Sequence, residues 1–441
     1  MSYPLSSAGR EAGVMRNYYK LTAEERKIIK TWNTNNQPLL VPAGEEKIII
    51  QEIQQQTLMH NHNNITRTEA YLQFYLRHPE VHWALLAHLV SRNGGWNMTD
   101  LKGSLLRFVF SQESVTDFFA FLERANAYIF HDAFPQLLLY ERWKTKGINY
   151  FHLLPHFGVS VFMKPVWDSF LKDRHSKLLT ISLIINEQHY IEGRLISNDY
   201  FRKNVYQTYL FKIQQLLRLN DVIFPYMDNG ITKLMGLTVS HFAPLEKRIE
   251  LGKRLYGMLY ESEDTFDQVE QFAKDVRHSG SRADYWPDTF SSINQPSRIL
   301  SPALTSAWEN CSHTFSGEDW YCSDKNTTVF FADINPAKRL EITSRYALTI
   351  RFLHAVSSVL QIKNKIRIAG HTTGIEQKGV NELGQNHQFK PGQKAPNNGY
   401  YVEIGETGST VNDPKQIKLE AGEKFPETKN QNRVWMPKRK P

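Results

Sequence analysis

Cysteine is scarce in this chain, whose 441 residues include only Cys311 and Cys322. The two cysteines form no CxxC pair, and with His313 they supply three candidate metal ligands where a structural zinc site takes four. We therefore favour free thiols over a metal site at these positions. Free thiols are typical of the reducing cytosol, so we expect a cytoplasmic protein.

Long apolar runs are also missing. The longest strongly apolar run, LLTISLII at 178–185, is far shorter than the about 20 residues that a membrane-spanning helix needs. The N-terminus, MSYPLSSAGREAGVMRNYYK, contains no apolar segment of the kind found in secretory signals. We therefore expect no membrane span. A peripheral membrane role is a weaker alternative that would need an exposed apolar helix face beside lysines.

Neither a concentrated charge nor a familiar catalytic motif is present. The net charge of +8 is spread thinly, since residues 378–441 hold 11 basic and 7 acidic residues and the rest of the chain holds 42 and 38. No stripe of lysine and arginine with interleaved aromatic residues favours nucleic-acid binding. GxSxG, GxGxxG, Walker A and HExxH patterns are absent, and we expect no cofactor.

Helical periodicity dominates the chain up to residue 365, so the sequence predicts a mainly α fold, arranged as a multi-helix orthogonal array or bundle. Glycine, proline and asparagine then become frequent, which indicates turns and short strands. We expect four segments: a flexible N-terminus at 1–19, an all-α domain at 20–365, a linker at 366–382 and a small β-rich module at 383–441.

Four local patterns predict where helices begin and end. Thr66 is the expected N-cap of a capping box. Gly94 and Gly95 are expected to end the helix that precedes them. Pro135 and Pro336 are each expected in the first turn of a helix, where proline is tolerated.

The C-terminal module resembles the small YjzC-like proteins of Bacillus. The resemblance is carried by GQNHQFKPGQKAPNNG, YVEIGETG and KFPETKNQNRVW. It implies a rubredoxin- or zinc-ribbon-like knuckle fold that has lost its cysteines, and it implies no function. We expect a metal-free module that derives from a separate small reading frame fused to the helical part.

The helical part resembles a second Bacillus family, the YppC-like proteins. The resemblance is carried by NITRTEAYLQFYLRHPEVHWALLAHLVSRNGGWNMTDLKG and FFAFLERANAYIFHDAFPQLLLYE. It extends over residues 20–365. That family is known only as a domain of unknown function, so the resemblance implies no activity, cofactor or catalytic residue.

One helical segment, HPEVHWALLAHLVSRNGGWNMTDLKG at 78–103, combines polar residues with an apolar surface nearly all round. A helix of this kind is buried nearly all round, so we expect His82, His88 and Arg92 to be desolvated. A buried guanidinium needs an acidic partner. The candidate partners are Asp100, Glu123, Asp132 and Glu141.

The histidines of this segment do not suggest a strong metal site. His82 and His88 are separated by about 120° around a helix, so they cannot face one ion together. His78 and His82 have the spacing of one helical turn, but His78 lies before Pro79 and its direction is undefined. His78 and His82 are thus weak metal candidates, and core histidines with satisfied hydrogen bonds are the favoured interpretation.

Two classes of function fit these patterns. The favoured class is a non-catalytic protein that binds a protein partner or a small ligand. Its ligand-binding candidates are Asn93, Trp96, Asn97 and Asp100. The alternative is a metal-assisted hydrolase centred on residues 78–100. Its catalytic candidates are His82, His88, Arg92 and Asp132. An enzyme needs these groups to converge on an open cavity, whereas a binding scaffold needs only that each is paired.

Overall fold

The computed structural model describes residues 41–42, 44–106, 110–206, 221–238, 244–260, 263–322, 327–332, 341–372, 388–405, 411–430 and 432–437. The chain divides into two compact units, Met1–Leu360 and Gln361–Pro441, which are described separately below. Three features expected from the sequence lie outside the described residues. They are the segment 1–19, the helix start at Pro336 and the part of the linker at 373–382.

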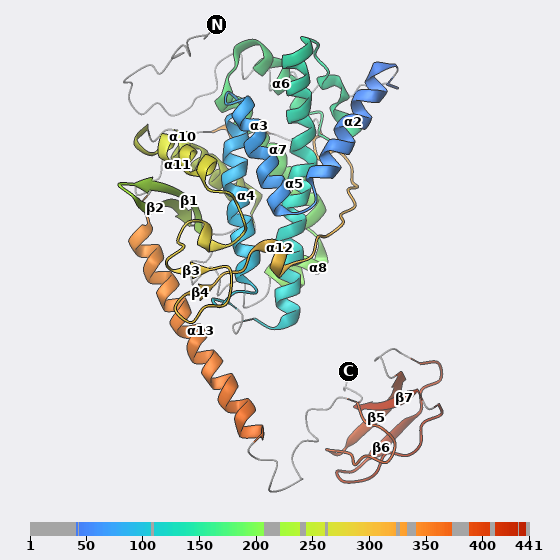
Figure 1. The fold of residues 1–441 in the computed structure, drawn as a ribbon. Helices are drawn as coiled ribbons and strands as arrows, with labels where there is room; N and C mark the ends of the chain where they lie inside the picture. Colours follow the sequence, from blue (N-terminus) through green and yellow to red (C-terminus); the bar gives the residue numbers. More distant parts are fainter. Residues whose placement is uncertain are drawn as a thin grey trace. The chain divides into compact units, whose positions relative to one another are not determined.

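The larger unit is mainly helical, as the sequence predicts (Figure 1). Its helices are α2 (Glu45–His60), α3 (Asn64–Arg77), α4 (His82–Asp100), α5 (Gln112–Lys146), α6 (Met163–Asp173), α7 (Ser176–Ile191), α8 (Asp199–Phe201), α10 (Leu245–Tyr260), α11 (Glu263–Asp275), α12 (Leu304–Ala307) and α13 (Thr343–Thr372). Helix α13 thus continues into the segment 366–382 that the sequence predicts as a linker. Helix α4 packs against α3, α5, α7 and α10, so it lies at the centre of the unit.

Two adjacent glycines let other parts of the chain approach the backbone of α4. The prediction that Gly94 and Gly95 end this helix is wrong, because α4 continues to Asp100. A β-carbon on Gly95 would lie 2.4 Å from Asn64 Oδ1 and 2.5 Å from His278 Nε2. These glycines cost about 1 kcal/mol each in helix propensity, and close packing rather than helix termination explains them.

The predicted helix starts at Thr66 and Pro135 are also wrong. Asn63, not Thr66, caps α3, and its side chain accepts the Thr66 N–H at 3.1 Å. Thr66 completes the box by accepting the Asn63 N–H at 3.2 Å. Pro135 opens no helix, because it lies inside α5, which extends from the N-cap Ser111 to a left-handed Gly147.

A β-hairpin interrupts the helices, so the expectation of an all-α domain is wrong in this detail. Strands β1 (Asp221–Asp228) and β2 (Ile231–Thr238) pair antiparallel, with Asp221 opposite Thr238. Asn229 and Gly230 form the turn with φ of 48° and 78°, the conformation that an Asn-Gly pair favours. The Asn93 side chain of α4 binds both the N–H and the C=O of Ile223 at 2.8 Å, which fixes the hairpin to the helix. A second, parallel pair is formed by β3 (Phe290–Ser291) and β4 (Ile299–Leu300).

The smaller unit is a three-stranded antiparallel sheet, in agreement with the expected β-rich module. Strand β5 (Gly399–Gly405) lies between β6 (Gln416–Leu419) and β7 (Arg433–Pro437). The core is aromatic, since the Phe389 and Phe425 rings stack with centroids 5.0 Å apart. The rings of Tyr401 and Trp435 pack against Phe425.

Glu403 of β5 is a buried carboxylate that ties three segments of this unit together. It accepts hydrogen bonds from the Lys429 N–H at 2.9 Å, the Lys415 N–H at 3.2 Å and Arg433 Nη1 at 3.0 Å. Burial opposes its ionisation, but these donors outweigh burial and lower the pKa of Glu403. The charge therefore stabilises the folded unit.

We expect Glu403→Gln to lower the free energy of unfolding of the smaller unit by about 2 kcal/mol, because charge-assisted hydrogen bonds are lost inside it. Since the folded pKa is lowered, the wild type should lose the same stabilisation as the pH falls below about 4.5. Hydrogen exchange of the amides in β5 and β7 measures both effects. Glu427→Gln at an exposed position is the control, and an equal effect of the two variants would contradict the prediction.

Candidate functional site

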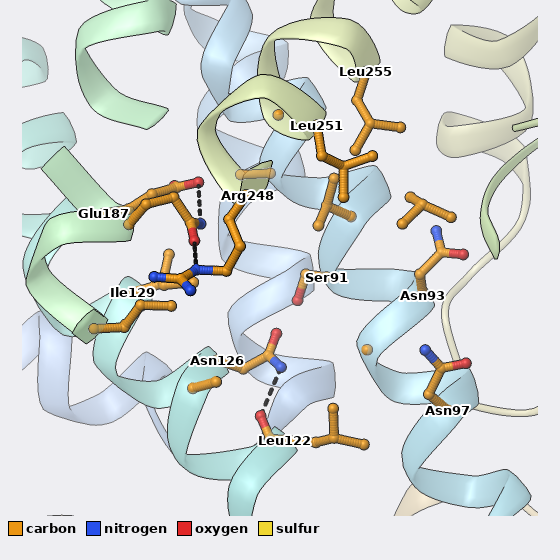
Figure 2. Close-up of a pocket in the computed structure, with 18 of the residues that line it drawn as sticks. Ser91, Asn93, Asn97, Leu122, Asn126, Ile129, Glu187, Arg248, Leu251 and Leu255 are labelled. Carbon is orange, nitrogen blue, oxygen red and sulfur yellow. Dashed lines mark hydrogen bonds between the residues drawn. The ribbon is translucent and has the colours of Figure 1, made fainter. Parts of the chain in front are cut away.

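A cavity of about 310 Å³ lies inside the larger unit between α4, α5, α7 and α10 (Figure 2). Its wall is mostly apolar and includes Leu86, Phe121, Ile129, Ile184, Leu251 and Leu255. Figure 2 shows Glu187 and Arg248 on one side of this pocket and Asn93 and Asn97 on the other. Small-molecule pockets have volumes of about 300–1,000 Å³ and a similar mixture of apolar walls and few polar groups.

Three of the four predicted ligand-binding residues line the pocket. They are Asn93, Asn97 and Asp100, whereas Trp96 does not line it. Each of these three residues already bonds to protein through at least one side-chain polar atom. Asn93 holds β1, and Arg282 donates to both oxygens of Asp100 at 2.6–2.9 Å and to Asn97 Oδ1 at 3.3 Å. These side chains therefore have structural roles at the wall of the pocket.

Glu187 lies on the opposite side of the pocket from Asn93 and Asn97, and Tyr71 and Trp83 also line the pocket. Glu187 Oε2 accepts the Trp83 indole N–H at 3.2 Å, and its Oε1 accepts from Gln188 at 3.3 Å. Gln188 in turn accepts from Arg248 Nε at 3.0 Å. The Tyr71 hydroxyl is buried and has no hydrogen-bond partner among the described residues. All five residues line the pocket.

Sequence reasoning missed Tyr71 and Glu187. Tyr71 lies in a helical segment that also contains Phe74 and Tyr75, and Glu187 lies two residues after the run 178–185 that predicts a buried element. An ionisable residue at the end of such a run was the available signal.

Two interior carboxyl groups, Glu187 and Asp132, have raised pKa values. Burial, together with a smaller contribution from Asp132, raises the pKa of Glu187 to about 8. Burial also raises the pKa of Asp132 to about 8, although Arg194 and the hydrogen bond from Asn186 oppose this effect. Glu187 is partly accessible because it faces the pocket, whereas Asp132 is fully buried and does not line it. Both groups therefore hold a proton at pH 7.

The predicted catalytic histidines are uncharged residues with protein partners. His82 stacks on Tyr260 with ring centroids 4.0 Å apart, and burial lowers its pKa to about 4. His88 Nδ1 lies 2.9 Å from the Thr68 carbonyl oxygen, and burial is the main cause that lowers its pKa to about 3. Neither histidine lines the pocket.

Arg92 is buried, as expected, but its acidic partner is Asp284 and not one of the four candidates. Arg92 Nη2 lies 3.9 Å from Asp284 Oδ2, and Nη1 donates to the Val276 carbonyl at 2.8 Å. The guanidinium also lies over the rings of Trp96 and Phe272. The other candidates are engaged elsewhere: Asp100 with Arg282, Glu123 with Arg67, Glu141 with Arg77 and Asp132 with Asn186.

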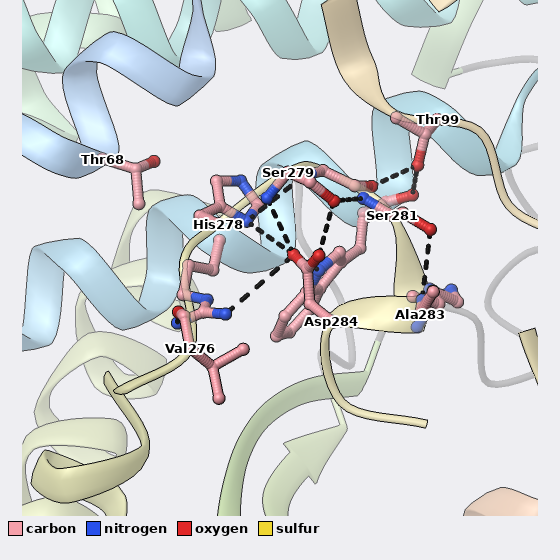
Figure 3. Close-up of polar contacts among 12 residues, drawn as sticks. Thr68, Thr99, Val276, His278, Ser279, Ser281, Ala283 and Asp284 are labelled. Carbon is pink, nitrogen blue, oxygen red and sulfur yellow. Dashed lines mark hydrogen bonds and ion pairs between the residues drawn. The ribbon is translucent and has the colours of Figure 1, made fainter. Parts of the chain in front are cut away.

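Asp284 is the centre of a polar cluster that sequence reasoning missed (Figure 3). It accepts from the Ser279 hydroxyl at 2.5 Å and the Ser279 N–H at 3.0 Å, and its Oδ2 lies 3.3 Å from His278 Nδ1. His278 Nε2 lies 2.9 Å from Asn64 Oδ1. Because the Ser279 hydroxyl binds the aspartate rather than the histidine, these residues are not arranged as a Ser-His-Asp triad.

The weak metal candidates lie in different surroundings. His78 Nε2 lies 3.3 Å from Glu141 Oε1, whereas His82 Nδ1 lies 3.0 Å from the Tyr256 hydroxyl. Within the described ranges, no three His, Cys, Asp or Glu side chains are grouped so that they could hold a metal ion. In the same part of the chain, no helix is both long and apolar enough to span a membrane.

The described residues thus form a mainly helical unit with an internal apolar pocket, and a separate small β unit. The chain belongs to the family "Protein of unknown function (DUF2515)", whose model matches residues 59–347. It is 41% identical over 315 residues to the uncharacterized protein YppC of Bacillus subtilis (strain 168), a match that covers 71% of this chain and 95% of that protein. The resemblance inferred for the helical part is confirmed.

The second resemblance is confirmed as well. Residues 383–437 match the YjzC-like protein family. The uncharacterized protein YjzC of Bacillus subtilis (strain 168) is 70% identical over 59 residues, which are 13% of this chain and 100% of that protein. This chain therefore joins counterparts of two separate Bacillus subtilis proteins. No solved structure matches the chain.

We expect Arg92→Met to lower the free energy of unfolding by about 3 kcal/mol, because Asp284 stays buried and loses its cation while most of the side-chain volume is retained. Urea unfolding followed by circular dichroism measures the change. Arg351→Met, at an exposed position of α13, should change stability by about 0.5 kcal/mol or less. If the two variants were equally stable, the Arg92 charge would not be needed for folding.

The protonated carboxyls predict a pH dependence of stability. Because the folded pKa values of Asp132 and Glu187 are raised to about 8, these groups favour folding at low pH, and the benefit is lost as the pH rises through about 8. The variant Asp132→Asn/Glu187→Gln cannot ionise there. Its Tm relative to wild type should therefore increase by about 5 °C between pH 6 and pH 8.5. A constant difference would show that both carboxyls titrate normally.

Proposed function

We propose that the DUF2515 unit is a non-catalytic, cytoplasmic protein that binds a small, mainly apolar molecule in the pocket between α4, α5, α7 and α10. The observation that carries this proposal is the cavity of about 310 Å³ with an apolar wall and a few polar groups at its sides. An apolar ligand gains free energy of about 25 cal/mol for each Å² of apolar surface that it loses to water.

The metal-assisted hydrolase is the weaker candidate. A general base must be unprotonated near neutral pH and must reach the reacting group. His82 and His88 are unprotonated but contact Tyr256 and the Thr68 carbonyl, and neither faces the pocket. Asp132 has its proton and is surrounded by α5 and α7 residues. These positions favour packing roles for the four catalytic candidates.

We also propose that the C-terminal unit is a metal-free relative of rubredoxin- or zinc-ribbon-like knuckles. Two segments that lie far apart in its sequence meet at a bridge between Lys394 and Lys424, in the two turns where such folds carry their metal ligands. Phe425 directly follows Lys424 of this bridge, and its ring stacks on Phe389 in an apolar core. Aromatic packing would thus replace the metal as the source of stability.

A pocket-filling substitution tests the ligand-binding proposal. The uncharged fluorescent probe N-phenyl-1-naphthylamine should bind the wild type saturably. Ala87→Phe places a ring in the pocket, and it should weaken probe binding about tenfold or more, a loss of about 1.4 kcal/mol. The measurement is a fluorescence titration at pH 7.

The matched control is Leu58→Phe, which adds a ring at an exposed position of α2 and should bind the probe as the wild type does. Thermal unfolding of both variants establishes that they fold, and Ala125→Phe fills the pocket from α5 if Ala87→Phe does not fold. Equal probe binding by wild type and a folded pocket-filling variant would contradict the proposal.

A further inference from the structure

Tyr71 brings an unused hydrogen-bond donor to the pocket. Tyr71 is only 3% exposed, and its ring packs edge-on against the Trp83 ring, with centroids 5.4 Å apart. Tyr71 lines the pocket, its hydroxyl is buried, and the described residues offer that hydroxyl no hydrogen-bond partner. Buried hydroxyl groups are nearly always hydrogen-bonded in folded proteins, so each exception requires an explanation.

Glu187 brings a second donor to the same side of the pocket. Both of its hydrogen bonds, from Trp83 and from Gln188, use the carboxyl oxygens as acceptors. With its pKa raised to about 8 by burial and by Asp132, Glu187 also has an acid hydrogen at pH 7. Neither of the two hydrogen bonds to Trp83 and Gln188 uses that hydrogen. Burial is the main cause that raises the pKa of Tyr71. The charge of ionised Glu187 is the next cause, so the two side chains lie near each other.

We propose that the polar end of the pocket ligand is an uncharged oxygen, as in a ketone, ester, amide or alcohol, which accepts hydrogen bonds from the Tyr71 hydroxyl and the Glu187 acid group. This inference rests on the proposed function and specifies the chemical class of its ligand. A carbonyl oxygen has two lone pairs, so it satisfies both donors at once.

The charged groups around Glu187 disfavour a charged ligand. Arg248, the cation on α10 that could bind an anion, already pairs with Glu192, and Asp132 of α5 is protonated at pH 7 and so attracts no cation. Tyr71 of α3 and Trp83 of α4 complete the surroundings and carry no charge. A cationic ligand would need ionised Glu187, and its affinity would increase with pH. An uncharged acceptor needs the protonated acid, and its affinity decreases with pH.

Four probes of equal chain length test this inference on the full chain. They are 2-decanone, 1-decanol, decylamine and decanoate, each used to displace N-phenyl-1-naphthylamine at pH 7. We expect 2-decanone and 1-decanol to bind about tenfold more tightly than decylamine and decanoate. Tyr71→Phe should weaken 2-decanone binding about tenfold, because one hydrogen bond to the ligand is lost, and should leave the hydrocarbon decane unaffected.

The pH dependence provides the second arm of the experiment. The wild type should lose about tenfold in 2-decanone affinity between pH 7 and pH 9, as Glu187 loses its proton. Glu187→Gln keeps an N–H donor without an ionisable group, so its affinity should stay constant over this range. Tighter binding of decylamine than of 2-decanone, or a Tyr71→Phe variant with unchanged ketone affinity, would overturn the inference.

The outcomes distinguish this inference from the proposed function. If the fluorescent probe itself does not bind, or if Ala87→Phe does not block it, the pocket is not a binding site and both proposals fail. If the probe binds and Ala87→Phe blocks it, but the four head groups bind equally, only the inference about the ligand oxygen is wrong.

Discussion

The larger unit depends on how closely its other parts approach α4 at Gly95. Asn64 of α3 and His278 meet in a hydrogen bond directly over this residue, where any β-carbon would lie within 2.5 Å of both. Their contact brings Asp284 next to Arg92 and so neutralises a guanidinium that is 1% exposed. A glycine in the middle of a helix loses more backbone entropy on folding than other residues do. Here its missing β-carbon leaves room for a buried ion pair and a buried histidine–amide contact.

Helix α4 therefore has two functionally different sides. His88, Arg92, Gly95 and Trp96 contact the cluster around Asp284 or α3, and none of them lines the pocket. Leu86, Val90, Asn93 and Asn97 face the pocket. Tyr71 of α3 and Glu187 of α7 line the same pocket. This division is why we assign binding to the pocket and not to the histidines, although the histidines are the more conspicuous residues in the sequence.

The sequence predicts local features of this fold better than long-range pairs. A helix that is apolar nearly all round must be buried, so the burial of Arg92 could be predicted from α4 alone. Its partner could not, because Asp284 lies in a segment rich in Ser, Asn and Pro that has no periodicity to place it. The Gly-Gly pair suggested a helix end because glycine permits both termination and close approach, and only the tertiary neighbours decide between them.

The pocket was harder to predict, because its polar side joins Tyr71 and Glu187 from helices that are distant in sequence. Asp132, a catalytic candidate in the sequence, has an indirect place in this arrangement. It accepts a hydrogen bond from Asn186, and Asn186 Oδ1 accepts the indole N–H of Trp320, so both sides of that amide are fixed. Asn186 is adjacent to Glu187 in α7, which restrains the direction in which Glu187 projects. The same carboxyl contributes to the raised pKa of Glu187, which links a buried residue outside the pocket to an ionisable group on the pocket wall.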